Sequence, residues 1–531
     1  MGKTKENRIL AGVSRRDFIK SAAFAGAGLT GAGLLAGCAP REASDSAKAS
    51  TGGVSVDDVE WKKEADVVIC GFGAAGAAAA IEALEAGSSV TVLEMASEGG
   101  GATKMSGGVV YMGGGTRLQK ACGVEDSLEN MKAYVKAVTN PSGGTERLVD
   151  LYCEESVGLC DWLESHGLKF DEAVELEGHT VTAPKGIGLQ YTGNERGWEY
   201  ASIATPAPRG HSPQSTGDLK GGGAMIFDPL KERVEESGAD IMYQTEATSL
   251  IQDEAGRVIG VRARGDEGEI AIKALKGVVL SAGAFTMNED MVADYCPEGI
   301  GLAQRTACPN DMGTGIKMGV RVGADLHGMG IANIQQFLYL PGRGPASGLL
   351  VDKWGLRFID EAAYGSWVGR AIYHHTPEAA FLVFDSEMRE DHAEHLESVA
   401  VTFEADSLED LARQMGVPEE SFVSSVNRYN GFAEAGDDAD YHKDPLFMKP
   451  LAVPPFCAID MNVSTCSFHT LGGLKINEKS QVISIDGSPI DGLYAAGRTA
   501  CAIFGRYPGS GSSIAEALIF GRIAGKEAAA R

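Results

Sequence analysis

The 531-residue sequence predicts an α/β fold in which a Rossmann-like domain is interrupted by a second, inserted α+β domain. The first supporting observation is Ala65–Glu94, where a buried-strand run, a GFGAAG turn, an alanine-rich helical pattern and a second strand-like run follow one another. The second is a change of character over residues 327–452, which carry more aromatic and charged residues and more amphipathic helical patterns. We therefore assign residues 61–326 and 453–531 to the first domain and residues 327–452 to the inserted one.

The GFGAAG turn has the order and spacing of a dinucleotide-binding βαβ unit. Gly71 permits the tight turn, Gly73 lets the backbone approach a pyrophosphate, and Gly76 lets the helix pack closely on the strand. The helix N-terminus faces the phosphates, and Glu94 stands at the distance from which a carboxylate accepts hydrogen bonds from a ribose. A glycine-rich turn in an ordinary α/β protein is the alternative, but strand, helix, second strand and acid all stand in their expected places.

Other stretches of the first domain predict further elements. Helical patterns cover residues 127–138 and 145–166, and the chain ends in a third over residues 512–529. Residues 179–224 are polar and interrupted by proline and glycine, which predicts an irregular excursion over the surface.

The N-terminus resembles an export signal. The sequence SRRDFIK at residues 14–20 resembles a twin-arginine motif, and the apolar run 21–37 that follows it ends in LAGC, which resembles a lipobox. We therefore expect residues 1–37 to be a signal peptide, Cys38 to carry a lipid anchor and residues 38–60 to be a flexible tether. A membrane-spanning anchor is the alternative, but the run is short and glycine-rich for a stable span.

Composition limits the partners that the protein can have. Residues 38–531 carry 41 basic and 71 acidic residues, a net charge near −30, which disfavours binding to nucleic acid or to an anionic membrane surface. This charge is compatible with a basic electron-donor protein. The ten cysteines contain no CxxC pair, so no covalent haem site or local iron–sulfur site is indicated, and no metal site is predicted. Cys153 and Cys160 are expected to be buried free thiols, with a disulfide between them as the alternative.

A set of short motifs, in this order and spacing, resembles one flavoprotein family. The motifs are GFGAAG at 71–76, GGATKMSGG at 100–108, VVLSAGAF at 278–285, DMGTG at 311–315, HTLGGLKI at 469–476, GLYAAG at 492–497 and SSIAEALIFGRIAG at 512–525. They resemble the flavoprotein subunits of fumarate reductase and succinate dehydrogenase, in the branch that includes urocanate reductase, cardiac-glycoside reductase and 3-ketosteroid dehydrogenases. The resemblance implies non-covalent FAD and a capping domain, here residues 327–452, that closes over the isoalloxazine.

The resemblance also implies which residues hold FAD. The expected set comprises the ADP-binding Gly71, Gly73, Ala75, Gly76 and Glu94, the pyrophosphate and flavin loop with Gly100, Thr103, Ser106 and Gly107, the adenosine-side Ala282 and Gly283, and Gly497, Ser513 and Ile514 near the flavin. Ser513 and Ile514 would place a helix N-terminus at the flavin pyrimidine, where its dipole stabilises the anionic reduced form. Arg498 departs from the family, which usually has an acid or amide contacting the ribityl chain at this position.

The family moves a hydride between flavin N5 and a carbon β to a carbonyl, and its members differ in the groups that bind the substrate. His469 matches the histidine of the fumarate reductases. Tyr364 stands near the place of their proton-donating arginine, and Pro508 stands at their carboxylate clamp, with Arg506 two residues earlier. Two of the three dicarboxylate features are thus missing or displaced, which disfavours fumarate.

The segment Tyr507–Gly511 matches the ketosteroid-type pattern better. In that pattern the tyrosine hydroxyl and the glycine amide, here Tyr507 and Gly511, bind the steroid carbonyl, and Tyr339 stands close to a further catalytic tyrosine. Phenol and amide donors suit a neutral enone, because no carboxylate has to be clamped. Ordinary packing is the alternative for Tyr339 and Tyr364, and a hydrogen bond to the backbone near the flavin is the alternative for His469.

The sequence therefore predicts an exported FAD-dependent reductase of a C=C bond conjugated to a carbonyl, such as a steroid-like enone. A hydride would pass from flavin N5 to the β carbon and a proton would come from a tyrosine. An external membrane or haem protein would supply the electrons, and the lipid anchor would hold the enzyme at the membrane. The alternatives are a 3-ketosteroid dehydrogenase running the reverse reaction, an acrylate reductase of the fumarate or urocanate type, and a flavin electron carrier without substrate chemistry.

Overall fold

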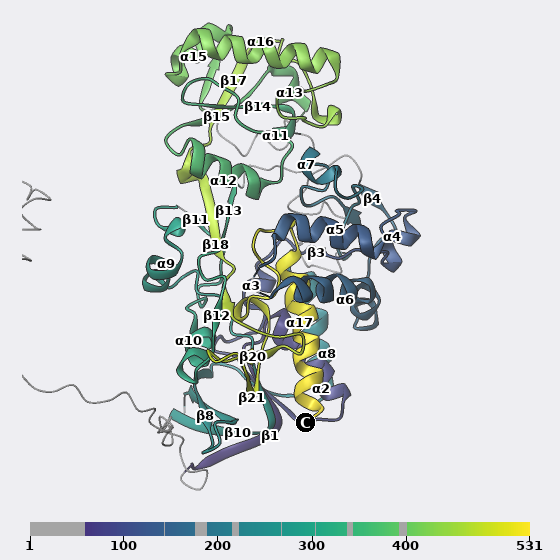
Figure 1. Cartoon of the computed structure of the whole chain (residues 1–531), viewed down its shortest axis with the longest axis vertical. Helices are drawn as coiled ribbons and strands as arrows, with labels where there is room; N and C mark the ends of the chain where they lie inside the picture. Colours follow the sequence, from purple (N-terminus) through teal and green to yellow (C-terminus); the bar gives the residue numbers. More distant parts are fainter. Residues whose placement is uncertain are drawn as a thin grey trace, which may run out of the picture. The chain divides into compact units, whose positions relative to one another are not determined.

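The computed structural model describes most of the chain (Figure 1). The described residues are 59–142, 144–175, 188–214, 222–266, 268–302, 304–336, 344–391 and 401–531. The expected signal peptide, Cys38, the tether up to residue 58, and Tyr339 lie outside these residues. All of the described residues belong to one compact unit.

A mixed sheet forms the centre of the fold. β1 (Trp61–Cys70) pairs in parallel with β2 (Val90–Leu93) on one side and with β10 (Gly268–Leu280) on the other. Residues 67–70 of β1 have no exposed surface, as expected for a strand covered on both faces. The sheet follows the order β20–β21–β10–β1–β2–β7, and the antiparallel strands β9 and β8 continue from β10. The remaining strands of this sheet are β7 (Asp240–Met242), β8 (Glu246–Gln252), β9 (Val258–Gly265), β20 (Gln481–Ile483) and β21 (Pro489–Ala495).

Two helices far apart in the sequence pack together beside this sheet, namely α2 (Ala74–Glu85) and the C-terminal α17 (Ser512–Ala529) (Figure 1). A Cβ atom at Gly521 would lie 2.5 Å from the carbonyl oxygen of Ala75, and one at Gly525 would lie 2.2 Å from that of Ala79. The two backbones can approach this closely because both positions are glycine. α8 (Ala224–Glu236) packs on α2 as well.

The inserted region carries its own four-stranded sheet. Its order is β14–β15–β17–β16, with α15 packed against β16 and β17. Strand β17 begins at residue 456, so this sheet takes a strand from beyond the sequence-based boundary at residue 452. Its elements are β14 (Leu349–Asp352), β15 (Ala380–Phe384), β16 (Phe403–Ala405), β17 (Phe456–Asp460), α12 (Gly365–His375), α13 (Ser386–Asp391), α15 (Leu408–Met415) and α16 (Glu419–Ala435).

A three-stranded sheet stands where the chain enters and leaves the inserted region. Its order is β11 (Gln304–Arg305), β18 (Cys466–Thr470) and β13 (Ala332–Gln336). Further short elements of the chain are α3 (Gly101–Lys104), α4 (Arg117–Ala121), α7 (Trp198–Ala201), α9 (Glu289–Tyr295), α10 (Thr314–Arg321), α11 (Gly344–Ser347), β12 (Leu326–His327), β19 (Gly473–Leu474) and the short 3-10 turns at 297–299, 445–447, 463–465 and 497–499.

Residues 188–195 contradict the expected surface excursion over 179–224, whereas residues 201–203 are exposed as expected. Residues 188–195 are all buried, and β5 (Leu189–Gln190) pairs with β6 (Gly210–His211) in a small sheet with β3 (Val110–Tyr111) and β4 (Val174–Glu175). The polar composition misled the prediction because these polar groups bond to one another and to distant loops rather than to water. The helices expected nearby are present as α5 (Leu128–Thr139) and α6 (Glu146–Ser165).

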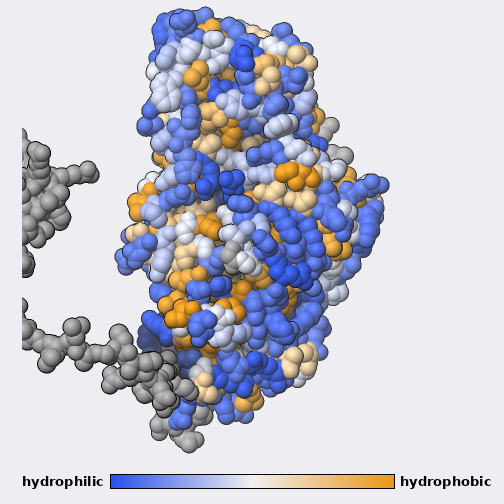
Figure 2. Space-filling model, viewed as in Figure 1, coloured by the Kyte–Doolittle hydropathy of each residue, from blue (hydrophilic) through white to orange (hydrophobic). Residues whose placement is uncertain are grey.

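Hydrophilic residues cover most of the face shown in Figure 2, and apolar residues occur on it in small groups. Over the described ranges, no helix is both long enough and apolar enough to cross a bilayer. Cys153 and Cys160 are buried and free, which excludes the disulfide alternative.

Candidate active site

A cavity of about 1080 Å³ opens at the carboxyl ends of β1, β2 and β10. This edge is where open α/β sheets bind their ligands. From there the cavity continues past α3 to Tyr364, His469 and Tyr507. Small-molecule pockets usually measure roughly 300–1,000 Å³, so this cavity is large for a single small ligand. It has room for an elongated cofactor.

The turn after β1 is shaped for close backbone contact. Gly71 has φ +104°, and a Cβ atom there would lie 2.4 Å from the carbonyl oxygen of Ser281. A Cβ atom at Gly76 would lie 2.0 Å from the carbonyl oxygen of Gly71. Both positions therefore require glycine, one for the turn and one for the packing of α2 against it.

Two side chains hold this turn and the start of α2. The carboxylate of Glu94 accepts hydrogen bonds from the backbone amides of Phe72 at 2.9 Å and Ala96 at 2.8 Å. The hydroxyl of Thr103 accepts one from the amide of Ala74 at 3.0 Å. Glu94 and Thr103 are both buried at the cavity wall. They keep the glycine backbone in the shape that a dinucleotide requires.

Most residues expected to hold the cofactor line the cavity. They are Gly71, Gly73, Ala75, Glu94, Thr103, Ser106, Gly107, Ala282, Gly283, Gly497, Ser513 and Ile514. Gly76 and Gly100 do not line it. Gly76 packs α2 on the turn, and the amide of Gly100 donates a hydrogen bond to the carbonyl of Phe72 at 2.7 Å, so Gly100 shapes the loop from behind.

The N-terminus of α17 faces the same cavity. The helix follows Gly511, which has φ +94° and lines the cavity together with Ser513 and Ile514. The buried hydroxyl of Ser513 has no hydrogen-bond partner among the described residues. Amides and dipole at a helix N-terminus favour an anionic group. The cradle of glycines, this helix terminus and the free Ser513 hydroxyl fit FAD.

The other end of the cavity carries neutral donors. Tyr507 is buried, and its hydroxyl oxygen accepts a hydrogen bond from the amide of Ser513 at 3.1 Å. Its own proton therefore remains available to a ligand. The hydroxyl of Tyr364 lies 3.0 Å from that of Ser510, and the ring centre of His469 lies 5.6 Å from that of Tyr507.

The side chains of His469, Tyr507 and Tyr364 are uncharged at neutral pH. Burial lowers the pKa of His469 to about 3, and the positive charge of Arg498 acts in the same direction. Burial raises the pKa of Tyr507, although the hydrogen bond from Ser513 acts against it, and burial also raises the pKa of Tyr364. The three side chains can therefore donate or accept hydrogen bonds without bringing a charge to the ligand.

The cations at the cavity wall already face carboxylates. Lys104 lies 3.1 Å from Glu98, Arg498 lies 3.2 Å from Asp311, and Arg305 lies 3.8 Å from Glu289. Arg506 does not reach the cavity in this structure: its side chain is exposed and its guanidinium lies 6.0 Å from the ring centre of Trp367. Across the described residues, no group of three or more histidine, cysteine or acidic side chains could hold a metal ion.

The segment 188–195 braces the Tyr507–Gly511 loop from behind. The amide of Ser510 donates to the carbonyl of Thr192 at 2.8 Å, and the hydroxyl of Thr192 donates to the carbonyl of Ser510 at 3.1 Å. The hydroxyl of Tyr134 donates to the carbonyl of Pro508 at 2.8 Å. These contacts fix the loop over sequence separations of more than 300 residues.

Asn194 links this brace to Tyr364. The side-chain Oδ1 of Asn194 accepts a hydrogen bond from the backbone amide of Tyr364 at 2.5 Å. The backbone amide of Asn194 donates to the hydroxyl of Tyr134 at 2.9 Å. Nothing in the sequence singles out Thr192, Asn194 and Tyr134. No motif marks them, because each acts through a partner that is distant in the sequence.

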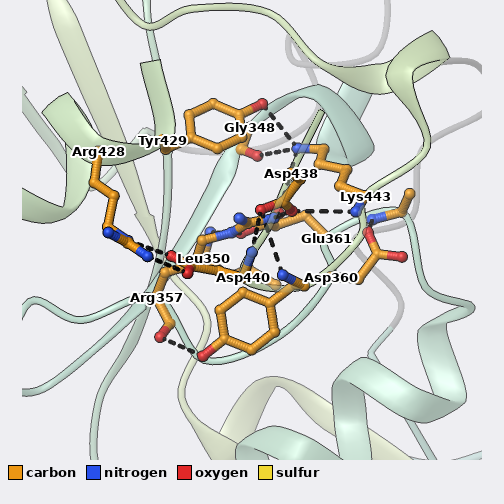
Figure 3. Close-up of polar contacts among 12 residues, drawn as sticks. Gly348, Leu350, Arg357, Asp360, Glu361, Arg428, Tyr429, Asp438, Asp440 and Lys443 are labelled. Carbon is orange, nitrogen blue, oxygen red and sulfur yellow. Dashed lines mark hydrogen bonds and ion pairs between the residues drawn. The ribbon is translucent and has the colours of Figure 1, made fainter. Parts of the chain in front are cut away.

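A buried ion cluster in the inserted region holds the chain that leads to Tyr364 (Figure 3). Arg357 binds Glu361 through two hydrogen bonds of 2.8 Å and lies 2.7 Å from Asp438, while Lys443 lies 3.3 Å from Glu361. Burial opposes ionisation of Glu361, but the charges of Arg357 and Lys443 outweigh it and hold its pKa below the usual value. The cluster fixes the turn that ends at Tyr364.

Fold, cavity and residue pattern define a FAD-binding oxidoreductase, and comparison with known proteins agrees. The family model described as "FAD binding domain" matches residues 66–514, so the chain belongs to this family. It is a FAD-dependent oxidoreductase acting on CH–CH groups, at a C=C bond next to a carbonyl. The fold class and the cofactor predicted from the sequence are confirmed.

Several relatives are similar over most of their length. The chain is 30% identical to the digoxin reductase of Eggerthella lenta, over 98% of this chain and 97% of that protein. The crystal structure of the 3-ketosteroid-Δ4-(5α)-dehydrogenase of Rhodococcus jostii, in complex with 4-androstene-3,17-dione, has a TM-score of 0.85 and 37% identity, over 90% of this chain and 99% of that one. The urocanate reductase of Eggerthella lenta is 28% identical, over 89% of this chain and 78% of that protein.

Proposed function

We propose that this protein is an extracytoplasmic reductase of a C=C bond conjugated to a neutral carbonyl, with steroid-like enones as its substrate class. The observation that carries the proposal is the neutral donor set of Tyr507, Gly511, Tyr364 and His469 at one end of a FAD-sized cavity. An enone carbonyl needs hydrogen-bond donors where enolate charge develops, and it needs no cationic clamp.

The residues of the chain divide the work of the reaction. When bound, FAD supplies the hydride that reaches the β carbon. The hydroxyl of Tyr507 and the amide of Gly511 bind the carbonyl oxygen. The backbone amide of Ser513 donates to the Tyr507 hydroxyl oxygen, which leaves the Tyr507 proton for the ligand. The proton for the α carbon comes from a tyrosine. We assign this role to Tyr364, whose hydroxyl is hydrogen-bonded to that of Ser510.

Charge favours a neutral substrate over a dicarboxylate. The lining cations Lys104, Arg305 and Arg498 already face carboxylates, and His469 stays neutral at pH 7 because its pKa is about 3. A substrate carboxylate would thus find Lys104 and Arg498 already paired, and only Arg305, which lies 3.8 Å from the exposed Glu289, as a loosely held countercharge. Similarity to the digoxin reductase and to the ketosteroid dehydrogenase supports a neutral substrate, whereas similarity to the urocanate reductase keeps the acrylate alternative in the test.

The export motifs support reduction as the physiological direction. A twin-arginine motif followed by the lipobox-like Cys38 would place the enzyme on the outer face of the membrane. There an external membrane or haem protein would supply electrons, because the sequence has no second dinucleotide fingerprint and no haem motif of its own.

Anaerobic oxidation of reduced viologen tests the proposal. The panel comprises ketosteroid enones, cardiac glycosides, cinnamates, urocanate and fumarate. We expect turnover of the neutral enones or unsaturated lactones. Turnover of the dicarboxylate alone would overturn the proposal, and turnover of urocanate or cinnamate alone would establish the acrylate reductase instead.

A further inference from the structure

Gln335 is a cavity residue with an unused hydrogen-bond donor. It belongs to β13 and is only 6% exposed, yet it lines the cavity. Its side-chain Nε2 is buried and has no hydrogen-bond partner among the described residues. A buried amide donor without a partner destabilises the empty site, so a ligand that accepts its hydrogen bond gains affinity.

The surrounding sheet places Gln335 at the substrate end. In the pairing of β13 with β18, Gln335 stands opposite Ser467 and Asn333 stands opposite His469. Residues directly opposite in antiparallel strands share a face, and so do residues two apart on one strand. Gln335 and His469 therefore face the same side of the sheet, and both line the cavity.

A chain of side chains orients the amide. The hydroxyl of Ser366, two residues after Tyr364, donates to the Oδ1 of Asn333, and the Nδ2 of Asn333 lies 3.5 Å from the Oε1 of Gln335. In this series of contacts the Oε1 of Gln335 is the acceptor, so its Nε2 is the atom left to donate to a ligand. The helix that begins after Tyr364 also packs on β13, because a Cβ atom at Gly369 would lie 2.7 Å from the carbonyl oxygen of Ile334.

We infer that Gln335 is a specificity-determining residue that donates a hydrogen bond to a second, neutral oxygen of the substrate, away from the enone carbonyl. The inference rests on the proposed function, which assigns that carbonyl to Tyr507 and Gly511. A neutral amide donor suits a ketone, ester, lactone or hydroxyl oxygen. The same donor would not strengthen the binding of a substrate whose corresponding end is a hydrocarbon.

Two ligands and two variants test this assignment. The ligands are a 4-ene-3-keto steroid with a C17 ketone and its 17-deoxy analogue. Their dissociation constants are measured by absorbance titration of the oxidised FAD-bound enzyme. The variants are Gln335→Leu and Gln335→Met, which both remove the donor and keep most of the volume. Gln336→Leu is the matched control, because the side chain of Gln336 donates to Thr465 at 2.7 Å and does not line the cavity.

We expect the wild-type enzyme to bind the 17-oxo steroid more tightly than the 17-deoxy steroid, by about fivefold to tenfold. Both Gln335 variants should lose this preference through weaker binding of the 17-oxo steroid alone, and Gln336→Leu should keep it. Unchanged preference in the Gln335 variants would overturn the inference but leave the proposed function standing. A changed flavin spectrum or FAD affinity in the ligand-free variants would assign the amide to the cofactor and also overturn it. If the wild type bound neither steroid, or bound both equally, the inference would be overturned, and the viologen panel would decide the proposed function separately.

Discussion

The dinucleotide end of the cavity is made of backbone, whereas the substrate end is made of side chains. At the first end, Gly71 and its neighbours form a turn that Glu94 braces and that closes against the backbone of Ser281. At the second end, Tyr507 and Tyr364 come from separate segments that Asn194 and Tyr134 join through buried hydrogen bonds.

This difference predicts how each end responds to change. A backbone cradle is insensitive to most side chains but is destroyed where a glycine is required. A side-chain site loses or changes its reaction when one hydroxyl or amide is replaced, and the cofactor remains bound. Loss of cofactor and loss of turnover can therefore be measured separately.

Gly71→Ala has the largest expected effect. The added Cβ would meet the carbonyl oxygen of Ser281 at 2.4 Å in a backbone with φ +104°, so the turn must move. We expect the purified variant to carry roughly tenfold less bound flavin than the wild type. The ratio of absorbance at 450 and 280 nm measures this flavin content. Gly87→Ala is the control, because φ is +82° there but nothing lies within 4 Å. Normal flavin content in Gly71→Ala would contradict the backbone assignment.

Tyr507→Phe should slow turnover and leave FAD in place. Loss of one donor to the carbonyl oxygen is expected to raise the barrier by about 2–4 kcal/mol, measured as kcat/KM with the best enone of the panel. Tyr494→Phe is the control, because its hydroxyl bonds the carbonyl of Glu527 at 3.2 Å and does not line the cavity. An unchanged rate would remove Tyr507 from the site.

Asn194→Ala tests the brace behind the side-chain end. It removes the acceptor for the amide of Tyr364, and we expect a roughly tenfold lower kcat together with a loss of about 1–3 kcal/mol in the free energy of unfolding. Asn430→Ala is the matched control, because Asn430 makes two hydrogen bonds of 2.8 Å with the backbone of Leu451. It should lower stability similarly without slowing turnover. Equal effects on kcat would show that Asn194 acts only on stability.

The pH dependence of stability is the smallest effect. Burial depresses the pKa of His469 to about 3 from an unfolded value near 6.5, so below pH 6.5 the unfolded chain binds a proton that the folded chain does not. Stability should therefore fall as the pH drops, by up to about 1.4 kcal/mol per unit from this group. Urea unfolding of wild type and His469→Gln between pH 6.5 and 5.5 measures the difference. Equal slopes would show that His469 is not held neutral.

The backbone end could be predicted because its signals are local. Glycine spacing and Glu94 lie in one continuous stretch, and most of the residues assigned to the cofactor line the cavity. The side-chain end could be predicted only in part. Tyr507 and Gly511 belong to a recognisable pattern, but the hydrogen bond between Tyr134 and Pro508 spans 374 residues and leaves no sequence signal. Arg506 adjoins Tyr507 yet is exposed, because adjacent residues of the loop face opposite sides.

The packing of α17 on α2 has a consequence for the order of folding. The glycines of α17 meet the backbone of α2 across more than 440 residues of sequence, and the same helix supplies Ser513 at the cavity. During synthesis the strands that precede α17 can form, but the cavity has no wall on this side until α17 has left the ribosome. The complete FAD cradle therefore exists only when the two helices are packed together, so bound FAD and the packing of α17 on α2 stabilise each other.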